Sequence, residues 1–165
     1  ELRKELRLQE IPSVIECFDV SHISGTSTVA SMVQFSDGNP DKTNYRRFKI
    51  RTVKGVDDYA AISEVVKRRY TRLKNEGVSM PDLVVIDGGK GQLMAALEVL
   101  RELDLRIPII SIAKKFEEVF VPGLRVALKI PKKSKALKLL QRIRDEAHRF
   151  AINYNRLLRK KENLR

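Results

Sequence analysis

Apolar and polar positions alternate along the first third of the chain with the period of strands. Three segments carry this pattern: Ser13–Val20, Thr28–Phe35 and Tyr45–Arg51, the last with alternating basic and apolar residues. Turn-like residues separate them at Ser21–Ser27 and Asp37–Pro40. Three consecutive strands joined by short turns indicate an antiparallel meander.

Helical spacing begins after the meander. Asp57 suits the N-cap position, apolar residues recur every three or four positions from Ile62 to Leu73, and Gly77 suits the helix end. The next segment, Leu83–Ile86, consists of four apolar residues, which is typical of a strand buried on both faces. An acid and a group of glycines follow this strand.

The rest of the chain predicts a second helix, a strand, a small hairpin and a long helix. These segments are Leu93–Leu103, Pro108–Ala113, Glu118–Val121 with Arg125–Ile130, and a helix from Lys133 onward. A meander that leads into β-α-β units predicts an α/β RNase H-like mixed sheet with helices on its faces. The hairpin and the long C-terminal helix are additions to that sheet.

Length and composition predict one soluble domain. The chain has 165 residues, of which 42% are hydrophobic and 33% charged, and no apolar run approaches the length of a membrane span. We expect residues 13–158 to form the domain, 1–12 to be a linker or the end of a preceding region, and 159–165 to be a tail. The lone Cys17 excludes an internal disulfide and favours a reducing, cytoplasmic location.

The charge balance predicts a polyanionic partner. There are 33 Lys and Arg residues against 21 acids, a net charge of +12, which favours nucleic acid first and an anionic membrane second over a merely solubilising surface. The candidate phosphate contacts are Arg46, Arg47, Lys90, Lys114, Lys115 and Arg144.

Two strand acids are the first candidates for chemistry. Asp87 follows a buried strand at the carboxyl end, where open α/β sheets bind their ligands. Asp19 lies in the first strand, which sheets of this layout place beside the strand that ends at Asp87. Two adjacent carboxylates repel each other, and a divalent cation is the simplest neutraliser. The alternative is that Asp19 caps a turn with Ser21 or Ser24.

Two further residues extend this candidate site. His148 lies at the edge of the apolar stripe of the last helix, where a neutral imidazole could bind a metal or accept a proton, although an edge histidine can be purely structural. Asp58 could be catalytic or could only complement the dipole of its helix. His22 is close to Asp19 in sequence and could support it. A P-loop is rejected because Gln92 follows Gly-Lys-Gly and no earlier glycine has the Walker spacing.

Several blocks together resemble the carboxyl-terminal nuclease region of the UvrC family of bacterial nucleotide excision repair. They are Phe18–His22, Tyr45–Arg47, Asp57–Ala61, Arg68–Tyr70, Asp87–Gln92 and Arg144–Ala151. The resemblance runs in order from about Val14 to Tyr154, which is nearly the whole chain.

The resemblance implies a DNA endonuclease that needs Mg²⁺ or Mn²⁺ and cuts on the 5′ side of a lesion. It implies Asp19, Asp87 and His148 as the catalytic and metal-binding residues, and Asp58 as a further important acid. Two acids and one histidine suit one metal better than two. The implied partners are lesion-bearing double-stranded DNA and, through a region outside this chain, UvrB, with no membrane and no nucleotide cofactor. The alternatives are a catalytically silent DNA-binding module of the same fold, or another RNase H-like nuclease of the endonuclease V or resolvase type.

Overall fold

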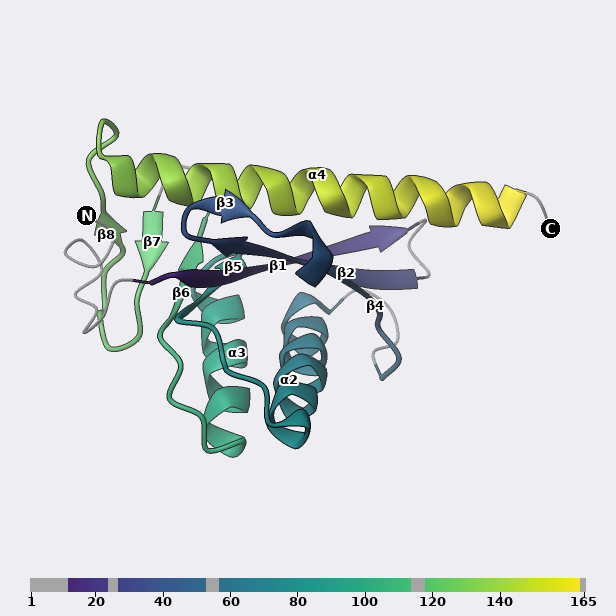
Figure 1. The fold of residues 1–165 in the computed structure, drawn as a ribbon, viewed down its shortest axis with the longest axis horizontal. Helices are drawn as coiled ribbons and strands as arrows, with labels where there is room; N and C mark the ends of the chain where they lie inside the picture. Colours follow the sequence, from purple (N-terminus) through teal and green to yellow (C-terminus); the bar gives the residue numbers. More distant parts are fainter. Residues whose placement is uncertain (1–11, 24–26, 53–56, 114–117, 164–165) are drawn as a thin grey trace.

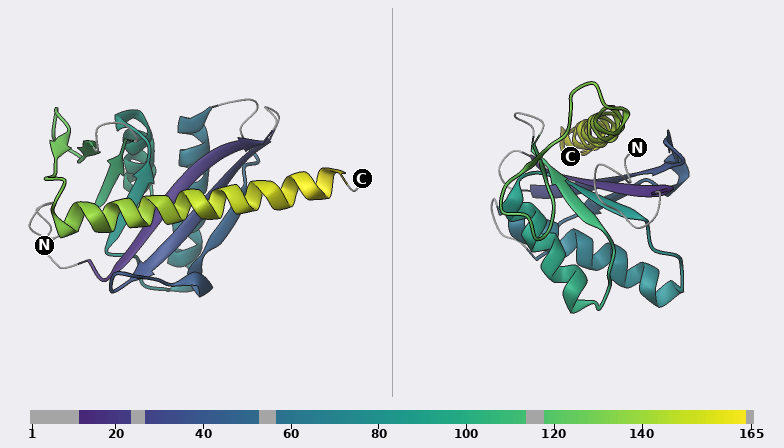
Figure 2. Two further views of the ribbon diagram at one scale, coloured as in Figure 1. Left: turned by 90° about the horizontal axis from the view of Figure 1, so that it is seen from above. Right: turned by 90° about the vertical axis from the view of Figure 1, so that its left-hand side faces the viewer.

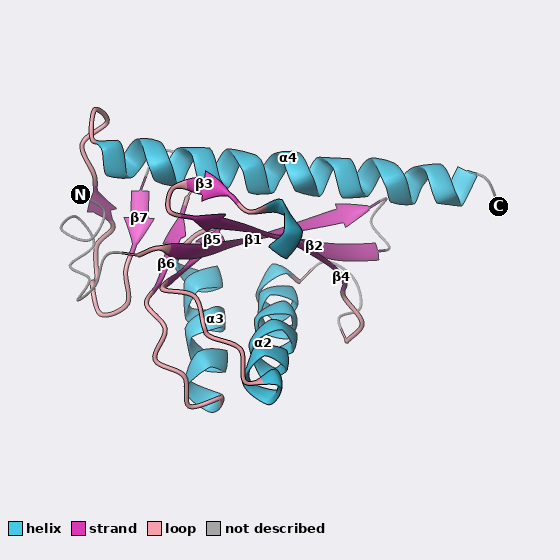
Figure 3. Ribbon diagram, in the orientation of Figure 1, coloured by secondary structure: helices cyan, strands magenta, loops and turns pink. Residues whose placement is uncertain are grey.

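The computed structural model describes residues 12–23, 27–52, 57–113 and 118–163, and they form a mixed sheet with helices on both faces (Figure 1). The strands are β1 (Val14–Ile23), β2 (Ser27–Ser36), β3 (Asn39–Pro40), β4 (Arg46–Lys49), β5 (Leu83–Asp87), β6 (Ile109–Ile112), β7 (Glu118–Phe120) and β8 (Leu128–Lys129). The helices are the short 3₁₀ helix η1 (Lys42–Asn44) and the α-helices α2 (Asp58–Glu76), α3 (Lys90–Glu102) and α4 (Lys135–Asn163). Figure 3 shows how strands and helices divide the chain.

The described strands form one sheet in the order β3-β2-β1-β5-β6-β7-β8, with β4 also paired to β2. The first strands are antiparallel, whereas β1, β5 and β6 run parallel to one another. This arrangement confirms the mixed sheet expected from the sequence. The small hairpin expected from the sequence is present as β7 and β8, and it extends the main sheet because β7 pairs with β6.

Three boundaries differ from the sequence-based expectation. The first two strands are longer, because their pairing continues to His22 opposite Thr28 and Ile23 opposite Ser27, in the segment expected to be a turn. The third strand of the meander covers only Arg46–Lys49. Helix α4 has 29 residues and continues to Asn163, so the first residues of the expected tail are helical.

The sheet separates two apolar layers. Side chains alternate along a strand, so Ile15 and Cys17 of β1 pack toward α4, whereas Phe18 packs toward α2 and α3. Figure 1 shows α4 on one face of the sheet and α2 and α3 on the other, and Figure 2 shows α4 crossing the strands at a slant. Among the described helices, none combines the length and the apolar character that crossing a bilayer requires.

Both shorter helices begin at the same end of the sheet. Asp57 caps α2 by accepting a hydrogen bond from the Ala60 amide at 3.0 Å, as the sequence predicts. The Gly89 amide donates to Gln92 Oε1 at 3.1 Å at the start of α3. A Cβ added to Gly91 would lie 2.6 Å from the Tyr59 hydroxyl. The missing Cβ of Gly91 therefore lets the start of α2 approach the start of α3.

Candidate active site

The two strand acids lie side by side. Strands β1 and β5 are parallel neighbours in which Phe18 is opposite Ile86, so the next residues, Asp19 and Asp87, are adjacent at a strand spacing of about 4.8 Å. Both belong to the face that packs against α4, because Cys17 and its partner Val85 lie in that layer. Asp19 is 5% exposed, and both carboxylate oxygens of Asp87 are buried.

The histidine of α4, His148, lies beside Asp19. His148 Nδ1 lies 3.4 Å from Asp19 Oδ2, and the imidazole is 54% exposed whereas the Asp19 side chain is 7% exposed. The ring therefore stands between the buried carboxylate and solvent. Three residues far apart in the sequence, on β1, β5 and α4, come together as the sequence predicts.

A thiol of β1, Cys17, and an arginine of α4, Arg144, lie close to the two acids. Burial raises the pKa of the Cys17 thiol, Asp87 and Asp19 raise it further, and Arg144 lowers it. The Arg144 side chain is 18% exposed, and its Nη1 is buried. Arg144 therefore brings a positive charge to the same buried region as the two carboxylates, where it offsets part of their repulsion.

Asp58 lies in a different place from the other candidate acids. It is the first residue of α2, and its Oδ1 lies 2.7 Å from His22 Nε2, while His22 Nδ1 lies 3.0 Å from the Thr28 hydroxyl. Alternation along β1 places His22 on the opposite face from Asp19. The structure thus joins His22 to Asp58, on the α2 side of the sheet, rather than to Asp19.

The donor set of the site fits a hard divalent cation. Mg²⁺ in proteins is bound by one or two carboxylates and completes its shell with water and substrate phosphate oxygens. Asp19 and Asp87 supply two such carboxylates on adjacent strands. Within the described ranges, no group of three or more His, Cys, Asp or Glu residues is arranged to hold a metal alone. The pair therefore suits a cation whose remaining ligands come from water and substrate.

The candidate phosphate contacts that the structure describes lie on different elements, and Arg144 of α4 is only 18% exposed. Arg46 and Arg47 lie on β4, beside a hollow that α4 borders, and Lys90 is the exposed first residue of α3. Lys114 and Lys115 lie outside the described residues. Arg149, Phe150 and the other α4 residues of the hollow were not singled out as binding residues from the sequence, since Phe150 belongs to the apolar stripe.

The sheet order and the paired acids beneath a helix-borne histidine define an RNase H-like nuclease fold. The chain belongs to the UvrC family, because the family model described as "UvrC RNAse H endonuclease domain" matches residues 3–152. UvrABC system protein C from Methanococcus maripaludis is 62% identical over 161 residues, which cover 98% of this chain and 31% of that protein. The same protein from Chlorobium chlorochromatii is 52% identical over 163 residues, covering 99% of this chain and 26% of that one.

The chain thus spans between a quarter and a third of these two relatives. Among solved structures, Ciona intestinalis endonuclease V in complex with inosine-containing DNA has a TM-score of 0.49 and 18% identity, covering 88% of this chain and 64% of that one. Thermus thermophilus RuvC has a TM-score of 0.34 and 15% identity, covering 61% of each chain. The fold assignment rests on the family and the sheet order, not on these two likenesses.

Proposed function

We propose that this domain hydrolyses a phosphodiester of lesion-bearing double-stranded DNA on the 5′ side of the lesion. The single observation that carries the proposal is the pair of buried acids, Asp19 and Asp87, adjacent on parallel strands beneath His148. Membership of the UvrC endonuclease family supports it. In this proposal UvrB is a partner through a region outside this chain, residues 13–158 are the working domain, and the protein acts in the cytoplasm without a membrane or a nucleotide cofactor.

Asp19 and Asp87 would hold one Mg²⁺ or Mn²⁺ ion. Such an ion neutralises phosphate charge and stabilises the leaving oxygen. The contribution of the chain is to keep the two carboxylates fixed and desolvated at the carboxyl ends of β1 and β5, where buried strands on both sides hold their backbones. A fixed pair of carboxylates needs no reorganisation when the charged substrate arrives.

His148 is suited to accept the proton of the attacking water. Its Nδ1 faces Asp19 at 3.4 Å, so a proton on Nδ1 would be held by the carboxylate. The opposite ring nitrogen, Nε2, then carries the lone pair that a general base needs. The side chain is 54% exposed, so water can reach the imidazole. Alternatively, His148 would act as a third ligand of the metal ion.

The main rival is a catalytically silent DNA-binding module. Burying two like charges side by side costs stability. A module that only binds DNA would gain nothing from that cost, whereas active sites regularly contain such pairs. The buried pair therefore favours catalysis. Asp58 is proposed to matter through its bond to His22 at the end of β1, where it would shape the site rather than take part in the reaction.

A nicking assay on a lesion-bearing duplex tests the proposal. We expect incision with Mg²⁺ or Mn²⁺ and none with EDTA. Asp87→Asn should remove incision while leaving DNA affinity unchanged or higher, and His148→Gln should lower the rate by about 100-fold, the lower end for loss of a general base. The matched control is Asp104→Asn, which removes one exposed acid at a residue of φ 57°, a conformation that asparagine tolerates.

Three outcomes would contradict this function: full incision by Asp87→Asn, incision that persists in EDTA, or loss of incision in the control. Parallel substrates separate the remaining alternative. Preferred cutting of a deaminated-base duplex or of a four-way junction would indicate a nuclease of the endonuclease V or resolvase type.

A further inference from the structure

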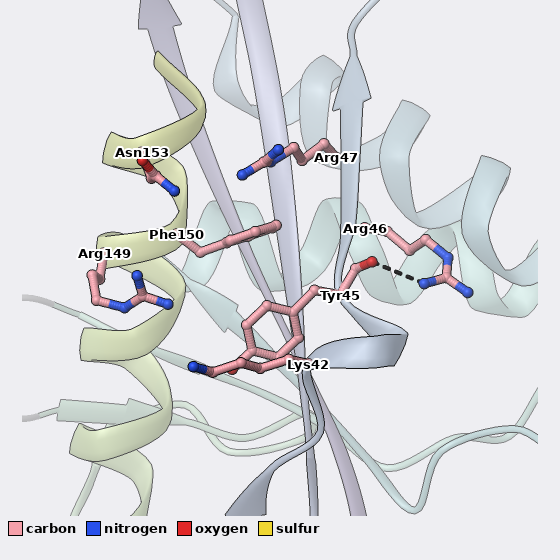
Figure 4. A pocket seen from close by; sticks show the side chains of 7 residues that line it. All are labelled: Lys42, Tyr45, Arg46, Arg47, Arg149, Phe150 and Asn153. Carbon is pink, nitrogen blue, oxygen red and sulfur yellow. Dashed lines mark hydrogen bonds between the residues drawn. The ribbon is translucent and has the colours of Figure 1, made fainter. Parts of the chain in front are cut away.

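Helix α4 has a second polar flank, which faces away from the candidate catalytic acids. Residues two positions apart on a helix point about 200° apart, so Phe150 projects from the side opposite to His148. This flank borders a hollow against β4 and η1 (Figure 4). The hollow has a volume of about 390 Å³ and is lined mainly by Lys42, Tyr45, Arg47, Arg149, Phe150 and Asn153. Its size lies within the roughly 300–1,000 Å³ of ligand-binding pockets.

Arg47 is held in place by aromatic rings of α4. Its guanidinium carbon lies 4.6 Å from the Phe150 ring centre and 5.3 Å from the Tyr154 ring centre. Cation–π contacts of this kind cover the flat face of the guanidinium, while its N–H groups lie in the plane of the fork. The Arg47 residue as a whole is exposed. A fork fixed in this way loses little side-chain entropy when it binds an oxyanion with two hydrogen bonds.

Glu146, a carboxylate close to this flank, is already engaged. The Tyr45 hydroxyl donates to Glu146 Oε2 at 2.6 Å, and Arg149 Nε and Nη2 donate to the two Glu146 oxygens at 2.6 and 2.8 Å. Burial, and then Glu146, raise the pKa of the Tyr45 hydroxyl, so this group stays a neutral donor. The network fixes Arg149 and Tyr45, which is also stacked edge-on at 5.0 Å from Phe150.

The lining of the hollow is therefore cationic. Lys42, Arg47 and Arg149 extend into the space between β4 and α4 in Figure 4, and none of the described residues that line the hollow is an acid. Arg46 also borders the hollow, but its Nη1 is bonded to the carbonyls of Thr43 and Tyr45 at 3.1 and 2.8 Å. In Figure 4 its side chain points away from α4.

We propose that this hollow binds a backbone phosphate of the nucleic acid strand, with the Arg47 fork as its main ligand. The sheet sets its position relative to the acids. Arg47 is opposite Ser31, and Ser31 is opposite Asp19, so the backbones of Arg47 and Asp19 are two strand spacings, about 10 Å, apart. Successive phosphates rise about 3.4 Å along one strand of a duplex. The phosphate in the hollow is thus about three or more nucleotides from the one at the acids.

This second site adds a DNA contact to the proposed nuclease function. The direction in which the strand would run from the hollow to the acids rests on that proposed function. A strand held at both points would pass over α4, with one phosphate at His148 and another in the hollow on the opposite flank. The hollow would fix the register of the strand, and the acids would act on a phosphate at a set distance from it. Binding in the hollow itself needs no metal and no chemistry.

DNA affinity measured in EDTA by fluorescence anisotropy tests the second site without any incision. Arg47→Ala should weaken binding by about threefold to tenfold and lower the slope of log K against log salt by about 0.9, the value for one lost phosphate contact. Arg47→Lys should recover only part of the affinity, because it keeps the charge and loses the fork. The control is Arg101→Ala, which removes an exposed arginine in the last turn of α3.

A methylphosphonate scan then locates the phosphate. Neutralising one phosphate at a time should reveal a position that weakens binding of the native protein and of Asp87→Asn, but not of Arg47→Ala. The proposal would be overturned if the native protein showed no measurable binding, or if Arg47→Ala had the same affinity and salt slope as the native protein. A phosphate scan that is identical for the native protein and for Arg47→Ala would also overturn it. Competition by inorganic phosphate as strong as by DNA would also overturn it, since the site would then bind a free anion. Thermal unfolding of each variant separates lost binding from lost folding.

The two proposals fail in different ways. If the protein binds DNA with the expected dependence on Arg47 but never cuts, the nuclease function is wrong and the phosphate site stands. If the protein cuts in an Asp87-dependent way but its DNA affinity does not depend on Arg47, the phosphate site is wrong and the nuclease function stands.

Discussion

Strand β1 carries two buried acids three residues apart, on opposite faces of the sheet, and their surroundings differ. Glu16 is 2% exposed, and it accepts hydrogen bonds from Arg69 Nη2 at 2.7 Å and from the Tyr70 hydroxyl at 2.8 Å. Asp19 is 5% exposed and lies beside a second carboxylate, Asp87. Asp19 Oδ2 lies 3.4 Å from His148 Nδ1, and the His148 side chain is 54% exposed to solvent.

Glu16 thus has a partner set that stabilises the fold, whereas Asp19 is the acid for which we propose a role in catalysis. The negative charge of Glu16 is balanced inside the α2 layer by a guanidinium and a phenol, which is how a buried charge becomes tolerable. On the α4 face two carboxylates lie side by side, Arg144 is close to them, and His148 lies between Asp19 and solvent. That arrangement is unfavourable for stability and favourable for binding a cation and a phosphate.

The largest expected effect is on incision, from the Asp19→Asn substitution. The amide keeps the shape but loses the charge that would hold the metal, so the incision rate should fall by about 1,000-fold or more, equivalent to roughly 4 kcal/mol. Stability to urea should stay equal or rise, because the repulsion with Asp87 is removed. Rates from single-turnover nicking and unfolding curves check both parts. If Asp19→Asn still cuts, or if it is markedly less stable than the native protein, the contrast between Asp19 and Glu16 is wrong.

The next effect is on stability, from the Glu16→Gln substitution. It leaves the buried Arg69 guanidinium uncompensated, which should cost about 3–5 kcal/mol in the free energy of unfolding. Incision per folded molecule should stay within a few-fold of the native value, because the α4 face is untouched. Urea unfolding measures the first quantity, and activity normalised to folded protein measures the second. Adding Arg69→Met should restore part of the stability, since the buried charge disappears with its partner.

The sequence alone predicts the acids of the α4 face better than their surroundings. A buried strand that ends at Asp87, and a first strand carrying Asp19, are local patterns, and the β-α-β order makes the two strands neighbours. The contact of Asp58 with His22 could not be predicted in this way. It depends on β1 continuing through His22, in a stretch whose serines and glycine resemble a turn, and on side-chain alternation at that point.

The hollow beside β4 escaped prediction for a related reason. The helical stripe of α4 predicts which residues are buried, and Phe150 belongs to that stripe. Only the slant of α4 across the sheet brings the edge of the stripe over Arg47, and that angle depends on the packing of both layers. Strand pairing can be predicted from residue order, whereas the angle at which a helix crosses a sheet cannot.

A smaller effect on incision is expected from Asp58→Asn. The substitution weakens the bond to His22 on the α2 side, so the incision rate should fall by less than about tenfold, equivalent to roughly 1.4 kcal/mol. Affinity for DNA in EDTA should not change. A loss as large as that of Asp19→Asn would mean that Asp58 acts directly on the metal or substrate, and the division between the two faces would then be wrong. Nicking rates for the two variants, measured side by side, decide this.

The smallest effect concerns Glu146, a bonded carboxylate near the surface that contrasts with the deeply buried Glu16. Hydrogen bonds from Arg149, and then from Tyr45, lower the pKa of Glu146. The stability it contributes is therefore fully present above the ordinary glutamate pKa of about 4.3 and is lost as pH falls through the lowered value. Glu146→Gln should cost no more than about 1 kcal/mol near pH 7, as for other solvent-screened pairs. The difference in melting temperature between Glu146→Gln and the native protein should shrink below about pH 4. A difference that stays constant down to about pH 2 would contradict this prediction. It would show that Glu146, unlike Glu16, does not stabilise the fold through its charge.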